Sequence, residues 1–101
     1  MRQTVIQRGD DVEIRFVGSL SMEDHGAFRA LLADVSQRKP KHCAFDLREL
    51  ESIDSAGIGM LLIASEEAKK ASWTFSVNNP TGHVRRVLEL ADLSKIVTIR
   101  T

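Results

Sequence analysis

The sequence has little of what covalent cross-links, membrane spans and nucleic-acid binding require. Its 101 residues include one cysteine, Cys43, so no disulfide can form within the chain. The longest apolar run, Ile58 to Ala64, is interrupted by Gly59 and is far shorter than the roughly 20 residues that cross a bilayer. Fourteen basic side chains balance fourteen acidic ones, whereas nucleic acids and anionic membranes attract a basic excess. We therefore expect a cytoplasmic protein with no nucleic-acid partner and no membrane insertion.

Aromatic residues are also few, at 5% with no tyrosine, but hydrophobic residues make up 43% of the chain. That content is ordinary for a globular protein, and 101 residues fit one domain. We expect a single domain spanning residues 1–101. Cys43 lies in an apolar stretch and is expected to be a small core residue.

Strand-like and helix-like patterns alternate along the chain. Apolar and charged residues alternate from Val12 to Phe16, which is typical of a half-buried strand, and Thr4–Arg8 precedes it across a Gly-Asp-Asp turn. Ser21 is a candidate N-cap for a helix that Pro40 ends. Its apolar positions follow helical spacing: Phe28, Leu31, Leu32 and Val35.

The later segments continue this alternation. Strands are predicted at residues 42–47, 72–77 and 95–100, with helices at 55–71 and after Pro80. The order is β-β-α-β-α-β-α-β. Strands separated by helices pair in parallel through right-handed crossovers. The fold class is therefore α/β, with a single mixed sheet and helices mainly on one face.

The segment from Leu50 to Leu61 passes from a strand into a helix, where function often collects in open α/β sheets. Asp54 or Ser55 can cap this helix by accepting a backbone hydrogen bond. Gly57 and Gly59 leave its first turn almost bare, so that another surface or an anion can approach. A purely structural interpretation is also open, in which Ser55 is a cap and the glycines permit tight packing.

Catalytic interpretations of this segment fit poorly. A nucleophile elbow needs a glycine two residues before the serine, and that position is Ile53. The glycine pattern lacks the third glycine of a dinucleotide site, and no Gly-Lys-Ser/Thr follows. The three histidines lie in three separate segments. We therefore expect no catalytic residues, no metal, no cofactor and no enzymatic activity.

Asp54–Gly59, with the sequence DSAGIG, resembles the D-S-[ST]-G-[LIV]-G signature of STAS domains (sulfate transporter and anti-sigma factor antagonist). Val17–Leu20 is similar to the family's G-E-L turn, and Phe45–Leu47 to the strand before the signature. Pro80–Leu93 is similar to the family's third helix. The resemblance covers nearly the whole chain, points to the anti-sigma factor antagonist type and implies a STAS fold.

In antagonists of this type, the serine after the signature aspartate is phosphorylated by a partner that is both a serine kinase and an anti-sigma factor. A phosphatase of the PP2C type removes the phosphate. The resemblance makes Ser55 the phosphorylation site. The unphosphorylated protein, a monomer when free, would bind its partner and release a sigma factor in a bacterial cell.

The resemblance also implies a partner-binding surface. Asp46 would lie at the strand end beneath the signature turn, and Met60 would be exposed beside the glycines. The full set of implied contact residues is Ser19, Ser21, Asp46, Asp54, Ala56, Gly57, Ile58, Gly59 and Met60.

Two departures from the family pattern stand out. Ala56 replaces a Ser or Thr, which removes an alternative phosphorylation site. Ser19 and Ser21 replace acidic residues, and the neighbouring Glu23 and Asp24 can substitute for them. The output could be transcription, biofilm formation or secretion. The alternative hypothesis is a constitutive STAS scaffold subunit of a transporter or signalling assembly, in which Ser55 is structural.

Overall fold

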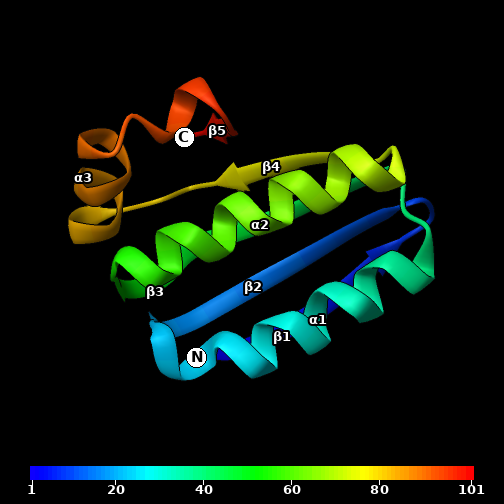
Figure 1. Cartoon of the computed structure of the whole chain (residues 1–101), viewed down its shortest axis with the longest axis horizontal. Helices are drawn as coiled ribbons and strands as arrows, with labels where there is room; N and C mark the ends of the chain where they lie inside the picture. Colours follow the sequence, from blue (N-terminus) through cyan, green and yellow to red (C-terminus); the bar gives the residue numbers. More distant parts are fainter.

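The computed structural model describes residues 1–101 and contains one five-stranded sheet, in which the strands lie in sequence order (Figure 1). β1 pairs antiparallel with β2, and the other neighbours pair in parallel. This confirms the predicted mixed α/β sheet. The elements are β1 (Arg2–Arg8), β2 (Asp11–Leu20), η1 (Met22–Asp24), α1 (His25–Arg38), β3 (His42–Ile53), α2 (Ser55–Ala71), β4 (Thr74–Asn78), α3 (Gly82–Leu90), η2 (Leu93–Lys95) and β5 (Thr98–Arg100).

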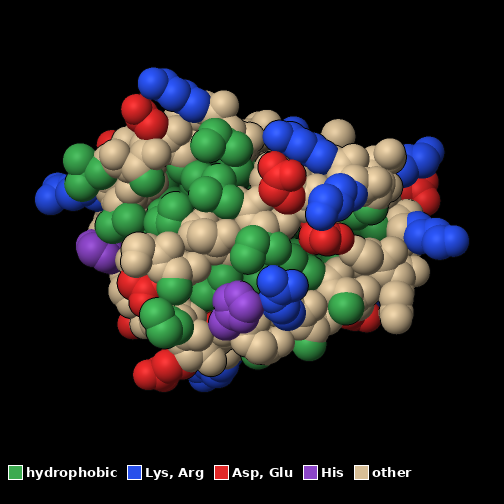
Figure 2. All heavy atoms as spheres, in the orientation of Figure 1, with side chains coloured by type: hydrophobic (Ala, Val, Ile, Leu, Met, Phe, Trp, Pro, Cys, Tyr) green, Lys and Arg blue, Asp and Glu red, His purple; other side chains and the backbone are tan.

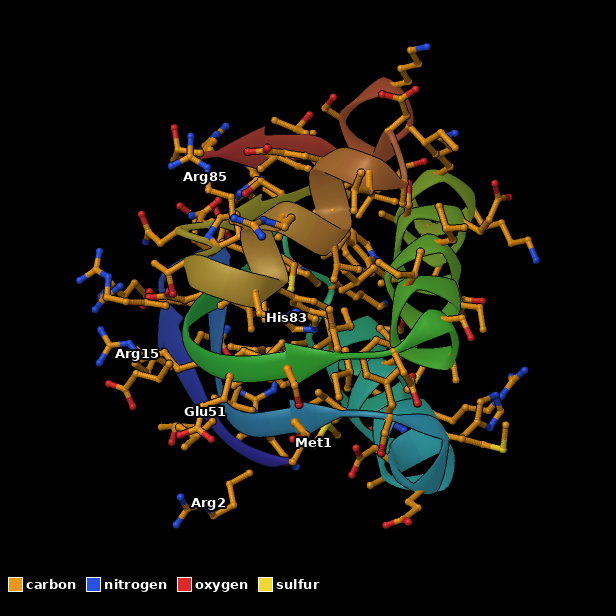
Figure 3. All side chains as sticks on the ribbon, turned by 90° about the vertical axis from the view of Figure 1, so that its left-hand side faces the viewer. Met1, Arg2, Arg15, Glu51, His83 and Arg85 are labelled. Atoms are coloured by element: carbon orange, nitrogen blue, oxygen red, sulfur yellow. The ribbon has the colours of Figure 1, made fainter.

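Helices α1 and α2 lie side by side on one face of the sheet, and α3 lies beyond the carboxyl end of β4, against β3 (Figure 1). The other face carries polar and charged side chains such as Arg15, which points away from the sheet (Figure 3). No helix in the structure is both long and apolar enough to cross a membrane.

The core lies between the sheet and the two helices, with Phe45 of β3 at its centre. The ring centroid of Phe45 lies 4.9 Å from that of Phe16, 5.8 Å from that of Phe28 and 4.7 Å from that of Phe75. All three pairs are edge-to-face, an arrangement that aromatic quadrupoles favour. All four residues of the apolar stripe predicted for α1 are buried, so that prediction is confirmed.

Strand β3 differs most from its prediction, because it continues six residues beyond Leu47 to Ile53. Two register shifts place two extra residues in β3 relative to β2. These bulges change the spacing of its buried residues from two to three, so that Leu47, Leu50 and Ile53 point inward. A strand with that spacing does not show the period-2 pattern by which strands are recognised.

The other boundaries shift by a few residues. β2 passes through Gly18, at φ +94°, and ends at Leu20. Ser21 forms a capping box with Asp24, but the box caps the short helix η1 that precedes α1. The last strand is shorter than predicted because Leu93–Lys95 forms a 3-10 helix.

Cys43 lies in the core, fully buried, as predicted. Burial raises the pKa of its thiol to about 12, which disfavours the reactive thiolate. We expect the thiol to resist a disulfide-exchange reagent at pH 8 in the native protein and to react within seconds in denaturant, with absorbance as the readout. Native labelling as fast as that of the denatured chain would contradict the buried position.

Candidate functional site

The signature turn is a single residue, Asp54, placed between the end of β3 and the start of α2. Its backbone is extended, with φ −105° and ψ −175°. Its side-chain Oδ1 accepts a hydrogen bond from the Gly57 N–H at 2.8 Å, and its carbonyl accepts one from the Ile58 N–H at 3.0 Å. Asp54 is therefore the N-cap of α2, a position where an acidic side chain also complements the helix dipole.

Ser55 is the first residue of α2 and is exposed. Its hydroxyl makes no hydrogen bond in the structure, because Asp54 satisfies the cap. The interpretation of Ser55 as the helix cap is thus wrong. The N–H groups of Ser55 and Ala56 precede the first intrahelical hydrogen bond, which the Ile58 N–H donates. The site presents a free hydroxyl beside two free backbone donors.

The two signature glycines have different surroundings. A Cβ atom at Gly57 would lie 2.5 Å from Ile53 Cγ1 and 2.5 Å from the carbonyl oxygen of Leu20. That same carbonyl accepts the N–H of Asp54 at 3.2 Å. Gly57 is therefore buried to let α2 approach the end of β2. A Cβ at Gly59 would meet nothing within 4 Å, so Gly59 leaves an open surface.

The end of β2 borders the signature turn through Leu20. Next to it, the hydroxyl groups of Ser19 and Ser52 lie 2.7 Å apart and join the ends of β2 and β3. Ser21 is half-buried, and its N–H donates to the Asp24 carboxylate at 2.9 Å. Ser19 and Ser21 thus flank Leu20, whose carbonyl accepts the Asp54 N–H, and each has a structural bond of its own.

Two expectations about the site are wrong. Asp46 lies within β3, paired with Arg15 and Asn78, rather than beneath the turn. It precedes Asp54 by eight residues, which is roughly 20–26 Å of strand. Met60 is 1% exposed and belongs to the core, because it lies one turn after the inward-facing Gly57. Asp46 therefore lies away from the signature turn, and the Met60 side chain does not reach the surface.

The start of α3 was missed as a neighbour of the site. Thr81 Oγ1 donates to the carbonyl of Arg48 at 3.2 Å, which joins the start of α3 to the middle of β3. Glu51 and His83 point to this same end of the molecule (Figure 3). Both border an open cavity of about 540 Å³. The sequence signal that could have revealed this arrangement is the apolar residue at every third position from Leu47 to Ile53, because it extends β3 towards α3.

The surface around Ser55 combines exposed polar residues with half-buried apolar ones. We define the signature surface as the accessible residues around the hydroxyl: Ser19, Asp54, Ser55, Ala56, Ile58 and Gly59. Leu62 lies one turn beyond Ile58 and is also half-buried. Figure 2 shows hydrophobic side chains gathered over α3 and the adjoining part of α2. No group of three or more His, Cys, Asp or Glu side chains is arranged to hold a metal ion.

Sequence comparison identifies relatives over most of the chain. A family model described as "Mlab, STAS domain" matches residues 4–98. A STAS-domain containing protein of Pseudomonas aeruginosa (strain UCBPP-PA14) is 26% identical over 91 residues, which cover 90% of this chain and 89% of that protein.

Solved structures share the fold at lower identity. An anti-sigma factor antagonist from Mycobacterium paratuberculosis has a TM-score of 0.86 at 21% identity, covering 98% of this chain and 84% of its own. The anti-sigma factor antagonist SpoIIAA in its unphosphorylated form has a TM-score of 0.76 at 23% identity, covering 99% and 89%. The phosphorylated form of Bacillus SpoIIAA has a TM-score of 0.73 at 20% identity, covering 99% of this chain and 92% of its own. A sulfate transporter family protein from Wolinella succinogenes has a TM-score of 0.79 at 14% identity, covering 94% of this chain and 80% of its own.

Proposed function

The chain belongs to the STAS domain family, and we propose that it is an anti-sigma factor antagonist whose binding is switched by phosphorylation of Ser55. In this proposal residues 1–101 act as one cytoplasmic STAS unit, monomeric when free. The observation that supports it most is the state of the Ser55 hydroxyl, which is exposed and not used by the helix cap. A hydroxyl with no structural bond can be modified without loss of stability.

The helix start is suited to a phosphate. Phosphorylation adds about −1.5 to −2 charges at neutral pH. The free N–H groups of Ser55 and Ala56 and the positive end of the helix dipole favour an anion there. The fold resembles both the unphosphorylated and the phosphorylated form of SpoIIAA. We therefore expect the domain to keep its structure when Ser55 is modified.

A partner seated on the signature surface would respond differently. Ile58 and Gly59 offer apolar and backbone contacts, and Asp54 already places one negative charge at the contact. Burying a phosphate beside that carboxylate without new cations costs several kcal/mol. Binding is then lost while the domain stays folded. The partner proposed for this surface is a serine kinase that is also an anti-sigma factor, and a PP2C-type phosphatase restores the bound state.

The proposal is tested by affinity capture from the native host with two baits, Ser55→Ala and Ser55→Asp. Ser94→Asp, which places the same charge at another exposed serine, is the matched control. We expect the Ser55→Ala and Ser94→Asp baits to retain a kinase-like protein that Ser55→Asp loses at least about tenfold, measured by quantitative mass spectrometry. With ATP, the captured protein should phosphorylate the wild-type chain at Ser55.

Equal capture by all baits would contradict the switch. It would support the second candidate function, a constitutive STAS subunit of a transporter assembly. The similarity to the Wolinella succinogenes sulfate transporter family protein favours that candidate. The identity of the captured protein separates the two, because the switch predicts a kinase and the second candidate predicts a transporter component.

A further inference from the structure

His42 begins β3 on the sheet face that α1 and α2 leave uncovered. The next residue, Cys43, points into the core, so His42 points to the opposite face. Both ring nitrogens lie close to hydroxyl groups of β4. Nδ1 is 2.6 Å from Thr74 Oγ1, and Nε2 is 3.1 Å from Ser76 Oγ, which is completely buried. The ring is thus held between two hydroxyls.

Each hydroxyl also has an onward acceptor. Thr74 Oγ1 donates to the carbonyl oxygen of Lys41 at 3.2 Å, and Ser76 Oγ donates to Asn78 Oδ1 at 2.9 Å. A hydroxyl has one proton to donate. When both onward bonds are made, both ring nitrogens of His42 must be donors. Only the charged imidazolium has two donors, so this arrangement satisfies the protonated ring completely.

The neutral ring requires one small change. With its proton on Nε2, the bond to Ser76 is kept, and the Thr74 hydroxyl turns from Lys41 to Nδ1. The Lys41 carbonyl still accepts the Thr74 N–H at 2.9 Å, so no group loses its last partner. We propose that His42 is a proton-binding site built into the open face of the sheet, which takes up its proton by rotation of the Thr74 hydroxyl.

The surroundings decide when the proton binds. Burial lowers the pKa of His42 below its usual value, the positive charge of Arg100 on β5 lowers it further, and Asp11 on β2 partly offsets both. Arg8 and Glu13 face the same shallow cavity of about 200 Å³ and form an ion pair with each other at 3.1 Å. The ring is therefore neutral at pH 7 and is protonated only in acid.

This lowered pKa fixes the sign of the effect on stability. The unfolded chain, in which histidine titrates near 6.5, binds more protons than the folded chain between the two pKa values. The contribution of His42 to the free energy of unfolding is therefore fully present above the pKa of the unfolded chain. It is lost as the pH drops from that value through the lower pKa of the folded chain. His42 begins β3 and Ser55 follows its other end, so this protonation takes place at the opposite end of the strand from the signature surface.

The test is an NMR titration of the three histidine rings of the full chain between about pH 4.5 and 8. His25 and His83 are exposed and serve as internal controls. We expect His42 to titrate at a lower pH than both, and its neutral form to carry the proton on Nε2 in long-range nitrogen correlations. Titration together with the controls, or a proton on Nδ1, would overturn the proposal.

Three variants separate this network from a general effect of burial. Arg100→Gln should raise the pH at which His42 titrates, whereas Arg86→Gln, an exposed cation on α3, should leave it unchanged. Thr74→Val should lower it, because the charged ring loses the acceptor for its Nδ1–H. Identical shifts in the two arginine variants, or a raised value in Thr74→Val, would refute the mechanism.

Discussion

Gly57→Ala is expected to destabilise the fold by about 2–3 kcal/mol, the upper part of the range for overpacked cores. The added methyl would lie 2.5 Å from both the Leu20 carbonyl oxygen and Ile53 Cγ1. A side chain could rotate away, but a backbone carbonyl that also accepts the Asp54 N–H cannot move without breaking that bond. Denaturant unfolding, with fluorescence of Trp73 as the probe, measures the loss.

Gly59→Ala is the matched control, two residues along the same helix. A Cβ there meets nothing within 4 Å. Alanine is a better helix former than glycine, so this variant should gain about 0.5–1 kcal/mol. The comparison removes the effect of helix propensity, which is the same for both substitutions. Equal changes in the two variants would show that the close approach of α2 to β2 is absent in solution.

The sequence predicts the position of the signature turn but not how its glycines are used. Both glycines follow Ser55 in the motif, and their difference depends on which way the first turn of α2 faces. That rotation is set by the Asp54 cap and by contact with Leu20, a residue 34 positions earlier in the chain. Long-range packing of this kind leaves no local pattern.

The errors at Asp46 and Met60 have different physical origins. The resemblance of Phe45–Leu47 to the family strand before the signature implies a strand that ends near Asp46, and the alternation of apolar residues also stops after Leu47. The strand in fact continues through two bulges, which interrupt the alternation without ending the pairing. Met60 could have been placed correctly, because Gly57, Met60 and Ala64 follow helical spacing along one buried face.

The α/β class was predictable because it rests on strong local signals. The stripe of α1 and the hairpin of β1 and β2 each lie within a short segment, and both are confirmed. Contacts between distant segments were harder to predict from the sequence. The bond from Thr81 to the Arg48 carbonyl and the ladder from His42 to β4 join residues more than 30 positions apart.

Phe45→Ala is expected to have the largest effect on stability, a loss of about 3–5 kcal/mol. Phe45 is fully buried, and three other aromatic rings have their centroids within 5.8 Å of its own. Truncation removes its burial and leaves a cavity between the sheet and α1. Calorimetric or denaturant unfolding measures the loss, and Met22→Ala, at a 73% exposed position, should change stability by less than about 0.5 kcal/mol.

A loss of under about 1 kcal/mol in Phe45→Ala would mean that the aromatic cluster is not the centre of the core.

The expected loss also defines how the Ser55 baits must be interpreted. Domains of this size have about 5–15 kcal/mol of stability, so Phe45→Ala removes a large share and should weaken capture of any partner. Ser55→Asp changes an exposed hydroxyl with no bond, and its melting temperature should match that of Ser55→Ala. Loss of the partner at unchanged stability therefore shows that the signature surface is the contact. Loss of the partner together with stability shows only that the core is damaged.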